Sequence, residues 1–152
     1  MDISFSESMD KLNYKLIESE KELAEAFKVR KEVFVEEQGI SEDIELDNND
    51  SEAMHIVVKD GKRVIGTARV LFPSLDVAKI ERMAILRHFR GKGIGSRIIS
   101  FLLAELRNRQ TRKVVLHAQY SSVAFYKSHG FAESSIPFNE AGIRHLKMER
   151  EL

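Results

Sequence analysis

Apolar residues recur at helical spacing in three segments of the chain. The first segment begins at Ser19 and Glu22, which fit a capping box, and it predicts a helix from about 20 to 36. A second, stronger apolar stripe follows a glycine-rich loop and predicts a helix over 94–109. A short third helix is predicted over 122–128.

The segments between these helices have the composition of strands. A short strand is predicted over 14–17, and a hairpin joins 55–59 to 63–72 through Asp60-Gly61, a type I′ turn signal. Pro73-Ser74 then turns the chain. Further strands are predicted over 77–86, 113–117, 131–138 and 145–151. The resulting order, β-α-βββ-α-β-α-ββ, predicts an α+β fold with a mixed sheet. One domain is expected over 1–152, with 1–12 as a loose arm.

Composition narrows the class of protein. Apolar residues make up 43% and charged residues 32%, as in soluble globular proteins. There is no long apolar run and no signal-like start, which favours the cytoplasm and no membrane association. The absence of cysteine excludes disulfides, thiolate zinc sites and a cysteine acyl-enzyme. Lys plus Arg and Asp plus Glu are both 24, and this zero net charge argues against nucleic-acid binding.

Residues 36–52 contain eight carboxylates and no Lys or Arg. Such a run can attract a cationic molecule such as a polyamine, an amino sugar or a lysine, or it can be a solvated loop. It does not fit a calcium loop, because a loop starting at Asp47 would place Glu52 where glycine is required. We therefore predict no metal.

The loop Arg90-Gly91-Lys92-Gly93-Ile94-Gly95-Ser96 joins a predicted strand to a predicted helix. Glycines allow close approach of a ligand, and free amides at a helix start bind anions. Four cations lie here, with no acidic residue from 87 to 104: Arg87, Arg90, Lys92 and Arg97. The pattern indicates a phosphate-bearing ligand rather than a solvated turn.

Two common phosphate motifs do not fit the loop. A P-loop needs Gly-x-x-x-x-Gly-Lys-Ser/Thr, which is absent. A dinucleotide fingerprint needs Gly-x-Gly-x-x-Gly, and its last position falls on Ser96 or Ile98. The acidic residue expected about 20 positions later is also missing from 109–116.

Arg90-x-x-Gly93-x-Gly95 resembles the Arg/Gln-x-x-Gly-x-Gly/Ala signature of the GNAT acetyltransferase superfamily. Phe125-Tyr126, followed three residues later by Gly130-Phe131, resembles its second hallmark. The segments 29–38 and 141–148 are similar to the small bacterial ElaA-like branch. The resemblance implies an acyl-CoA N-acyltransferase fold of about six or seven strands and about four helices.

The resemblance also implies where acetyl-CoA lies. The co-substrate would occupy a gap between strands at 79–86 and 113–119, with its pantetheine arm paired to Met83, Ala84 and Ile85. The amides of Arg90, Gly91, Lys92, Gly93, Ile94, Gly95 and Ser96 would hold the pyrophosphate. Gln119 matches a branch position that contacts the coenzyme or the acceptor. Tyr126 matches the tyrosine that serves as general acid to the leaving thiolate and contacts the coenzyme.

The general base has two candidates. Glu81 shares a strand face with Met83, and Glu37 lies in the acidic run; either could act through a water. A reaction with no dedicated base is the alternative. His117, at the end of a predicted strand, is either a proton relay or a structural residue.

The acceptor site is less defined than the donor site. Arg30, Gln38 and His145 match the ElaA-like branch and are candidate substrate contacts, with a structural role as the alternative for His145. The predicted reaction is acetyl transfer from acetyl-CoA to a primary amine of a small molecule or peptide by direct attack. The alternatives are a non-catalytic acyl-CoA sensor and, from the resemblance of 27–34 to their opening motif, a relative of acyl-homoserine-lactone synthases. A homodimer is compatible with the sequence, which does not identify the acceptor.

Overall fold

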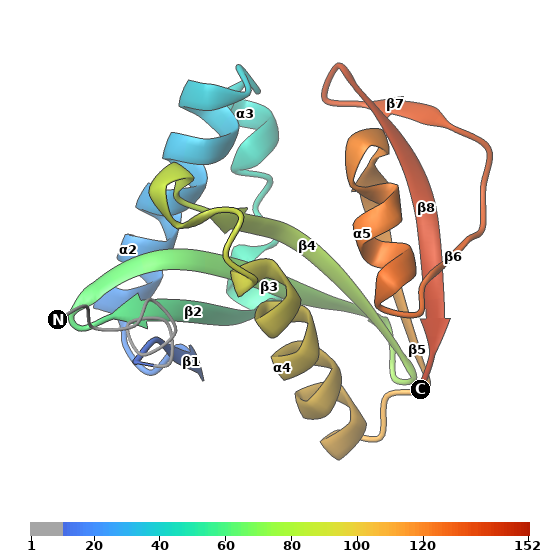
Figure 1. Ribbon diagram of the computed structural model, residues 1–152, viewed down its shortest axis with the longest axis horizontal. Helices are drawn as coiled ribbons and strands as arrows, with labels where there is room; N and C mark the ends of the chain where they lie inside the picture. Colours follow the sequence, from blue (N-terminus) through green and yellow to red (C-terminus); the bar gives the residue numbers. More distant parts are fainter. Residues whose placement is uncertain (1–10) are drawn as a thin grey trace, which may run out of the picture.

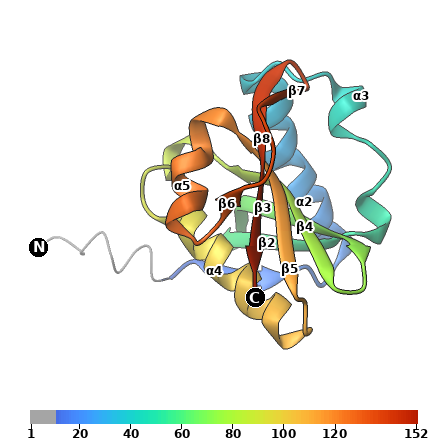
Figure 2. The same ribbon diagram turned by 90° about the vertical axis from the view of Figure 1, so that its right-hand side faces the viewer.

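A computed structural model describes residues 11–152 as one twisted sheet with helices on both faces (Figures 1 and 2). All but the last two residues of the expected arm over 1–12 lie outside the described residues. In chain order the elements are β1 (Asn13–Leu16), α2 (Glu20–Arg30), the π-helix η1 (Lys31–Glu37), α3 (Glu42–Glu45), the 3-10 turn η2 (Asp50–Glu52), β2 (Met54–Asp60), β3 (Arg63–Ser74), β4 (Val77–Ile85), η3 (Arg87–Phe89), α4 (Ile94–Asn108), β5 (Lys113–Gln119), η4 (Tyr120–Ser122), α5 (Val123–Ser128), β6 (Ala132–Glu133), β7 (Phe138–Glu140) and β8 (Ile143–Glu151).

The strands lie in the order β1-β2-β3-β4-β5-β8-β6, with β7 also paired to β8. Strands β4 and β5 are parallel and the other described pairs are antiparallel, so the predicted mixed sheet is confirmed. Figure 2 shows α4 and α5 on one face of the sheet and α2 and α3 on the other. The helix α4 is the crossover between the two parallel strands, as such a connection requires.

Several boundaries differ from the predictions for local reasons. The predicted strand 131–138 is two short pieces, β6 and β7, with Pro137 between them, because proline cannot donate to a ladder. The first hairpin turns at Gly61-Lys62, where Gly61 alone has positive φ, so the expected type I′ turn at 60–61 is wrong. The next turn is also later, after Ser74, and Pro73 lies in an irregular part of β3.

The predicted helix over 20–36 begins correctly but changes type. Ser19 caps it, since its Oγ accepts from the Glu22 amide at 3.2 Å, while the Glu22 carboxylate accepts from the Glu18 amide at 2.8 Å. The α-helix ends at Arg30 and continues as a π-helix to Glu37. Such wider turns commonly lie at functional sites.

Candidate active site

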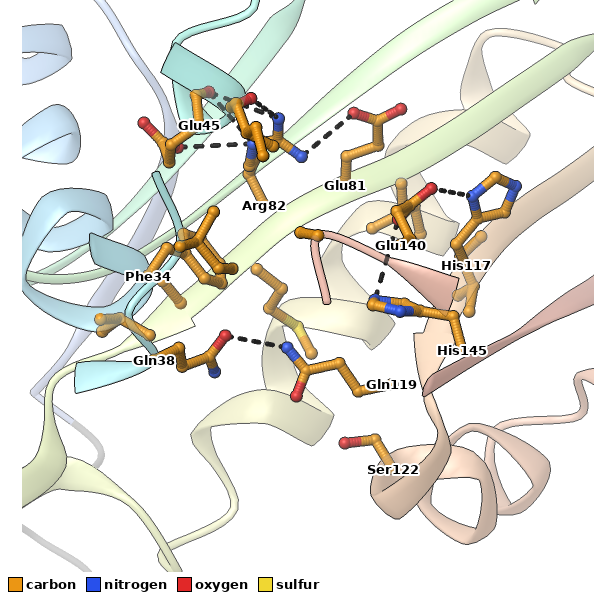
Figure 3. A pocket seen from close by; sticks show the side chains of 18 of the residues that line it. Phe34, Gln38, Glu45, Glu81, Arg82, His117, Gln119, Ser122, Glu140 and His145 are labelled. Carbon is orange, nitrogen blue, oxygen red and sulfur yellow. Dashed lines mark hydrogen bonds and ion pairs between the residues drawn. The ribbon is translucent and has the colours of Figure 1, made fainter. Parts of the chain in front are cut away.

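A cleft of about 620 Å³ opens where β4 and β5 separate (Figure 3). Their parallel pairing ends at Ile80 and Leu116. Beyond that point β4 carries one residue more than β3, so that Arg82 and Met83 both lie opposite Ala68, and Arg82 has φ 55°. A bulge bends its strand, so the end of β4 turns away from β5 and leaves that edge without a strand partner.

The separated edge of β4 presents Met83, Ala84 and Ile85 to the cleft. The Ile85 carbonyl accepts from Arg90 Nε at 2.8 Å, which ties the glycine-rich loop to the end of the strand. An extended ligand chain can pair with such an edge as a further strand would. This is the edge that the sequence resemblance assigns to pantetheine.

The glycine-rich loop enters α4 through two residues with left-handed backbone. Gly91 has φ 74°, and Gly93, the N-cap of α4, has φ 84°. A Cβ added at either position would meet no atom within 4 Å, so the backbone here is open to a ligand. The first turn of a helix leaves its amides without intrahelical acceptors and is positive in potential. The loop can therefore hold an anion.

Glu37 binds the loop rather than the cleft. Arg90 donates to both of its carboxylate oxygens, at 2.9 and 2.7 Å, and Arg87 lies 3.6 Å away. These hydrogen bonds hold the pKa of Glu37 below its ordinary value. Glu37 does not line the cleft, and the ion pair instead fixes the loop to η1.

Helix α5 brings Tyr126 into the cleft from the face that carries α4. Because Gly95 has no side chain, the Phe125 ring lies only 3.4 Å from where its Cβ would be. His129 Nε2 lies 3.0 Å from Ser96 Oγ, a second contact between the helices. Tyr126 lines the cleft, and burial raises the pKa of its phenol to about 12. Tyr126 therefore stays protonated at neutral pH.

Gln38 and Gln119, both predicted site residues, meet across the cleft. Gln119 Nε2 donates to Gln38 Oε1 at 3.0 Å, and this hydrogen bond joins the end of η1 to the end of β5 (Figure 3). Both side chains line the cleft.

On the α3 side of the cleft, three arginines and four carboxylates form an ion-pair network. Its members are Arg30, Arg69, Arg82, Glu45, Asp47, Asp50 and Glu81. The central side chain, Arg69, is completely buried and lies 2.6 Å from Asp47, 3.0 Å from Asp50 and 2.6 Å from Glu81. This network was not predicted from the sequence because, apart from the neighbours Glu81 and Arg82, its pairs join residues 12 to 37 positions apart.

The network corrects two expectations. Arg30 does not contact the cleft: its side chain is 1% exposed and is held by Glu45 at 2.6 Å and Asp50 at 2.7 Å. The acidic run is only partly solvated, because Glu45, Asp47 and Asp50 pair with internal arginines, whereas Glu36, Glu42, Asp43 and Glu52 are exposed. The paired carboxylates hold the loop of α3 against the sheet.

Glu81 lines the cleft but is heavily paired. It lies 2.6 Å from Arg69 and 3.0 Å from Lys79. Burial alone would raise the pKa of Glu81, but the hydrogen bonds from Arg69 and Lys79 outweigh it and the pKa is lowered. A carboxylate with a lowered pKa is a weak proton acceptor.

Two histidines share one carboxylate on the opposite wall. His117 Nδ1 lies 2.9 Å from Glu140 Oε1, and His145 Nε2 lies 3.7 Å from Glu140 Oε2 (Figure 3). All three side chains line the cleft, and Phe138 packs against both imidazoles. Glu140 was not predicted as a site residue.

A family model described as an acetyltransferase (GNAT) domain matches residues 15–152. The chain belongs to the GNAT acetyltransferase family. The Bacillus subtilis protein YjcF, named an uncharacterized N-acetyltransferase, is 36% identical over 137 residues, covering 90% of this chain and 97% of that protein.

Solved structures agree with this assignment. Escherichia coli ElaA superposes with a TM-score of 0.83 at 26% identity, covering 92% of this chain and 99% of that one. A GNAT acetyltransferase of Elizabethkingia anophelis, solved with acetyl-CoA bound, shares the fold with a TM-score of 0.74 at 16% identity, over 94% and 99% of the two chains. The predicted GNAT fold and the likeness to ElaA are confirmed, and the protein is an acyltransferase of this family. In the part of the chain from 11 to 152, no helix is long and apolar enough to span a membrane.

Proposed function

We propose that this GNAT enzyme transfers an acetyl group from acetyl-CoA to a primary amine of a small molecule or peptide by direct attack. We take residues 1–152 to act as one domain, since strands from both ends of the described chain belong to one sheet. A cytoplasmic location remains a prediction.

The observation that carries this proposal is a continuous path for the donor. It runs from the Gly91–Ser96 amides at the start of α4, along the free edge of β4 at Met83–Ile85, to Tyr126. The start of α4 suits a pyrophosphate, and the strand edge suits the two amides of a pantetheine arm. In this arrangement the thioester lies in the gap between β4 and β5.

Tyr126 is placed to meet the leaving sulfur. A thiol ordinarily has a pKa of about 8.5, well below the value of about 12 that burial gives the Tyr126 phenol. The phenol therefore stabilises the departing thiolate by donating a hydrogen bond, and full proton transfer to sulfur is less favourable than it would be from an unburied phenol. The chain has no cysteine, so a thioester intermediate on the enzyme cannot form.

The amine approaches from the other face of the sheet, where Gln38, Glu81 and His145 line the cleft. We assign Glu81 and Glu37 to holding arginines rather than to proton abstraction, because their hydrogen bonds lower both pKa values. Gln38 and Gln119 remain proposed contacts to acceptor or coenzyme, since their mutual hydrogen bond closes this part of the cleft.

The test is thiol release from acetyl-CoA in the presence of spermidine, glucosamine, an aminoglycoside and a lysine-containing peptide. Amine-dependent release, with the N-acetyl product seen by mass spectrometry, supports the proposal. Tight acetyl-CoA binding without release for any amine would overturn it and favour a sensor.

A further inference from the structure

The proposed reaction produces a proton at the attacking nitrogen, and neither predicted carboxylate is suited to take it. Glu37 does not line the cleft. Glu81 lines it but is bound by Arg69 and Lys79. The pair His117 and Glu140 lies on the same wall as the predicted acceptor contact His145 and has no other assigned role.

The β7–β8 hairpin places Glu140 beside His117. It ends β7 directly before the turn Ala141-Gly142, in which both residues have positive φ, 52° and 74°. Two such residues form a type I′ turn, whose twist matches a tight hairpin. An alanine in this conformation costs about 1 kcal/mol or more, so the hairpin is held by its surroundings. Part of this support comes from Phe138 at the start of β7, whose ring packs edge-on against His117 of β5, with 5.1 Å between the ring centroids, and stacks on His145.

The hydrogen bonds decide which nitrogen of each imidazole carries the proton. An ionised carboxylate can only accept, so His117 Nδ1 carries the hydrogen that Glu140 accepts at 2.9 Å. In the neutral ring, His117 Nε2 is then an unprotonated acceptor. His145 Nδ1 lies 2.7 Å from the Ile143 carbonyl and is likewise the protonated nitrogen.

We propose that His117 is the general base of this acyltransferase, that it takes the proton of the attacking amine on Nε2, and that Glu140 is the residue that positions it. This inference rests on the proposed function. A carboxylate on the far nitrogen fixes the tautomer and stabilises the imidazolium that forms.

The step conserves protons and electrons. The amine lone pair forms the C–N bond while the C–S bond of the thioester breaks. Sulfur leaves as a thiolate that accepts a hydrogen bond from Tyr126 and is protonated by water. His117 Nε2 takes the nitrogen proton and returns it to water after the amide departs.

The other charged groups near His117 are themselves paired, and none of them is assigned the role of base. Lys147 lies opposite His117 on β8 and is paired with Glu149 at 3.4 Å, while Lys79 on β4 is paired with Glu81. His145 faces the second oxygen of Glu140. Although two imidazoles and a carboxylate often bind metals, no group of three such side chains among residues 11–152 is arranged to hold an ion.

The experiment compares His117→Asn, His117→Ala and Glu140→Gln with the wild type, using spermidine, glucosamine and a lysine peptide as acceptors. His88→Asn is the matched control, because His88 is exposed in η3 and does not line the cleft. Measurements are kcat/KM across pH, acetyl-CoA affinity by calorimetry, and thermal stability.

We expect His117→Asn to lose about 100-fold in kcat/KM, the range for a general base, with unchanged acetyl-CoA affinity and loss of the acidic limb of the pH profile. Added imidazole should restore part of the activity of His117→Ala. Glu140→Gln should lose roughly 10-fold, since the amide oxygen still accepts the Nδ1 proton, and its acidic limb should move to lower pH.

The outcomes separate the two proposals. A wild type without amine-dependent turnover overturns the proposed function and the base with it. An active wild type whose His117 variants keep both full activity and the acidic limb overturns the base alone. A folded His117→Ala variant that is inactive and gains nothing from imidazole also counts against a proton-transfer role.

Discussion

Replacing Arg69 by Met tests whether the buried network stabilises the fold. Arg69 is completely buried, and its guanidinium neutralises Asp47, Asp50 and Glu81 at 2.6 to 3.0 Å. Methionine retains most of the apolar stem of arginine, so the substitution removes the charge while changing the packing little. The three carboxylates would then face one another without their shared cation.

The expected cost is large for a single substitution. Breaking a buried ion pair from one side costs about 3–5 kcal/mol, because the remaining charge stays desolvated. Asp47 is 27% exposed and the other two carboxylates about half that, so water softens the loss and we expect about 4 kcal/mol. In a chain of 152 residues this corresponds to a fall in Tm of roughly 10 °C.

The pH dependence of the stability loss distinguishes a loss of charge pairing from a loss of packing, because a packing loss would not change with pH. In the wild type, Arg69 holds the pKa of Asp47 below its ordinary range. The stabilisation that this ion pair gives the folded state is therefore fully present above the unfolded-state pKa of about 4, and it is lost as pH falls through the lower pKa of the folded state. In Arg69→Met, Asp47, Asp50 and Glu81 each keep another cation but lose their shared one, so their pKa values rise relative to the wild type and the penalty is relieved as they protonate. The stability difference between variant and wild type should therefore be smaller at about pH 5 than at about pH 7.5.

Urea denaturation at both pH values measures this difference. Arg109→Met is the matched control, since Arg109 is 48% exposed and lies 3.7 Å from Glu105, a surface pair that contributes less than about 1 kcal/mol. A loss below about 1 kcal/mol for Arg69→Met, or one that does not change with pH, would refute the reasoning.

Three further predictions follow from single positions. Gly93→Glu should lower acetyl-CoA affinity in calorimetry more than about 100-fold by placing a carboxylate at the pyrophosphate site. Its Cβ meets no atom within 4 Å, so the fold should be retained despite the strained φ of 84°. Gly61→Glu is the control, since it also has a positive φ, 62°, in a distant turn; it should bind acetyl-CoA normally, and equal affinities of the two variants would contradict the site. Tyr126→Phe should reduce kcat by roughly 10- to 100-fold, since a hydrogen bond to a charged group contributes about 1.5–3 kcal/mol, with little change in acetyl-CoA affinity; full turnover would remove its role at the sulfur. Gln110→Gly should raise the free energy of unfolding, measured with urea, by about 0.5–1 kcal/mol, because Gln110 follows α4 with φ 63° in a Schellman motif, where glycine is favoured. Arg109→Gly is the control: the φ of Arg109 is −87°, so glycine there should lower the free energy of unfolding.

The sequence predicted those features whose cause is local. The capping residue Ser19 forms the expected hydrogen bond, and the apolar stripe after the glycine loop is the buried face of α4. Each depends on residues within one or two turns of each other, which periodicity and cap chemistry detect. The two predicted hairpin turns were found but misplaced by one and two residues, because register is also set by cross-strand packing.

The bulge in β4 could not be predicted in this way. It places Arg82, a non-glycine residue, at φ 55°, and the neighbouring residues carry no glycine or proline that would indicate it. The conformation is stabilised instead by distant partners: Arg82 donates to the Glu45 carbonyl and lies 3.2 Å from Asp47. The acidic run was consequently interpreted without its arginines, which come from α2, β3 and β4.

The two halves of the cleft differ in how much the sequence alone reveals. A pyrophosphate is bound chiefly by backbone amides, which must be consecutive, so glycines within six residues are enough to indicate the site. In the proposed mechanism the amine is deprotonated by a side chain, and a suitable geometry for this step can be assembled from any elements that meet in space. Here His117 lies two residues before the end of β5, and Glu140 lies 23 residues later on a hairpin; they meet because Gln119 pairs with His145 while β7 folds back on β8. The donor therefore follows from a motif, whereas the base, and with it the nature of the acceptor, depends on strand register.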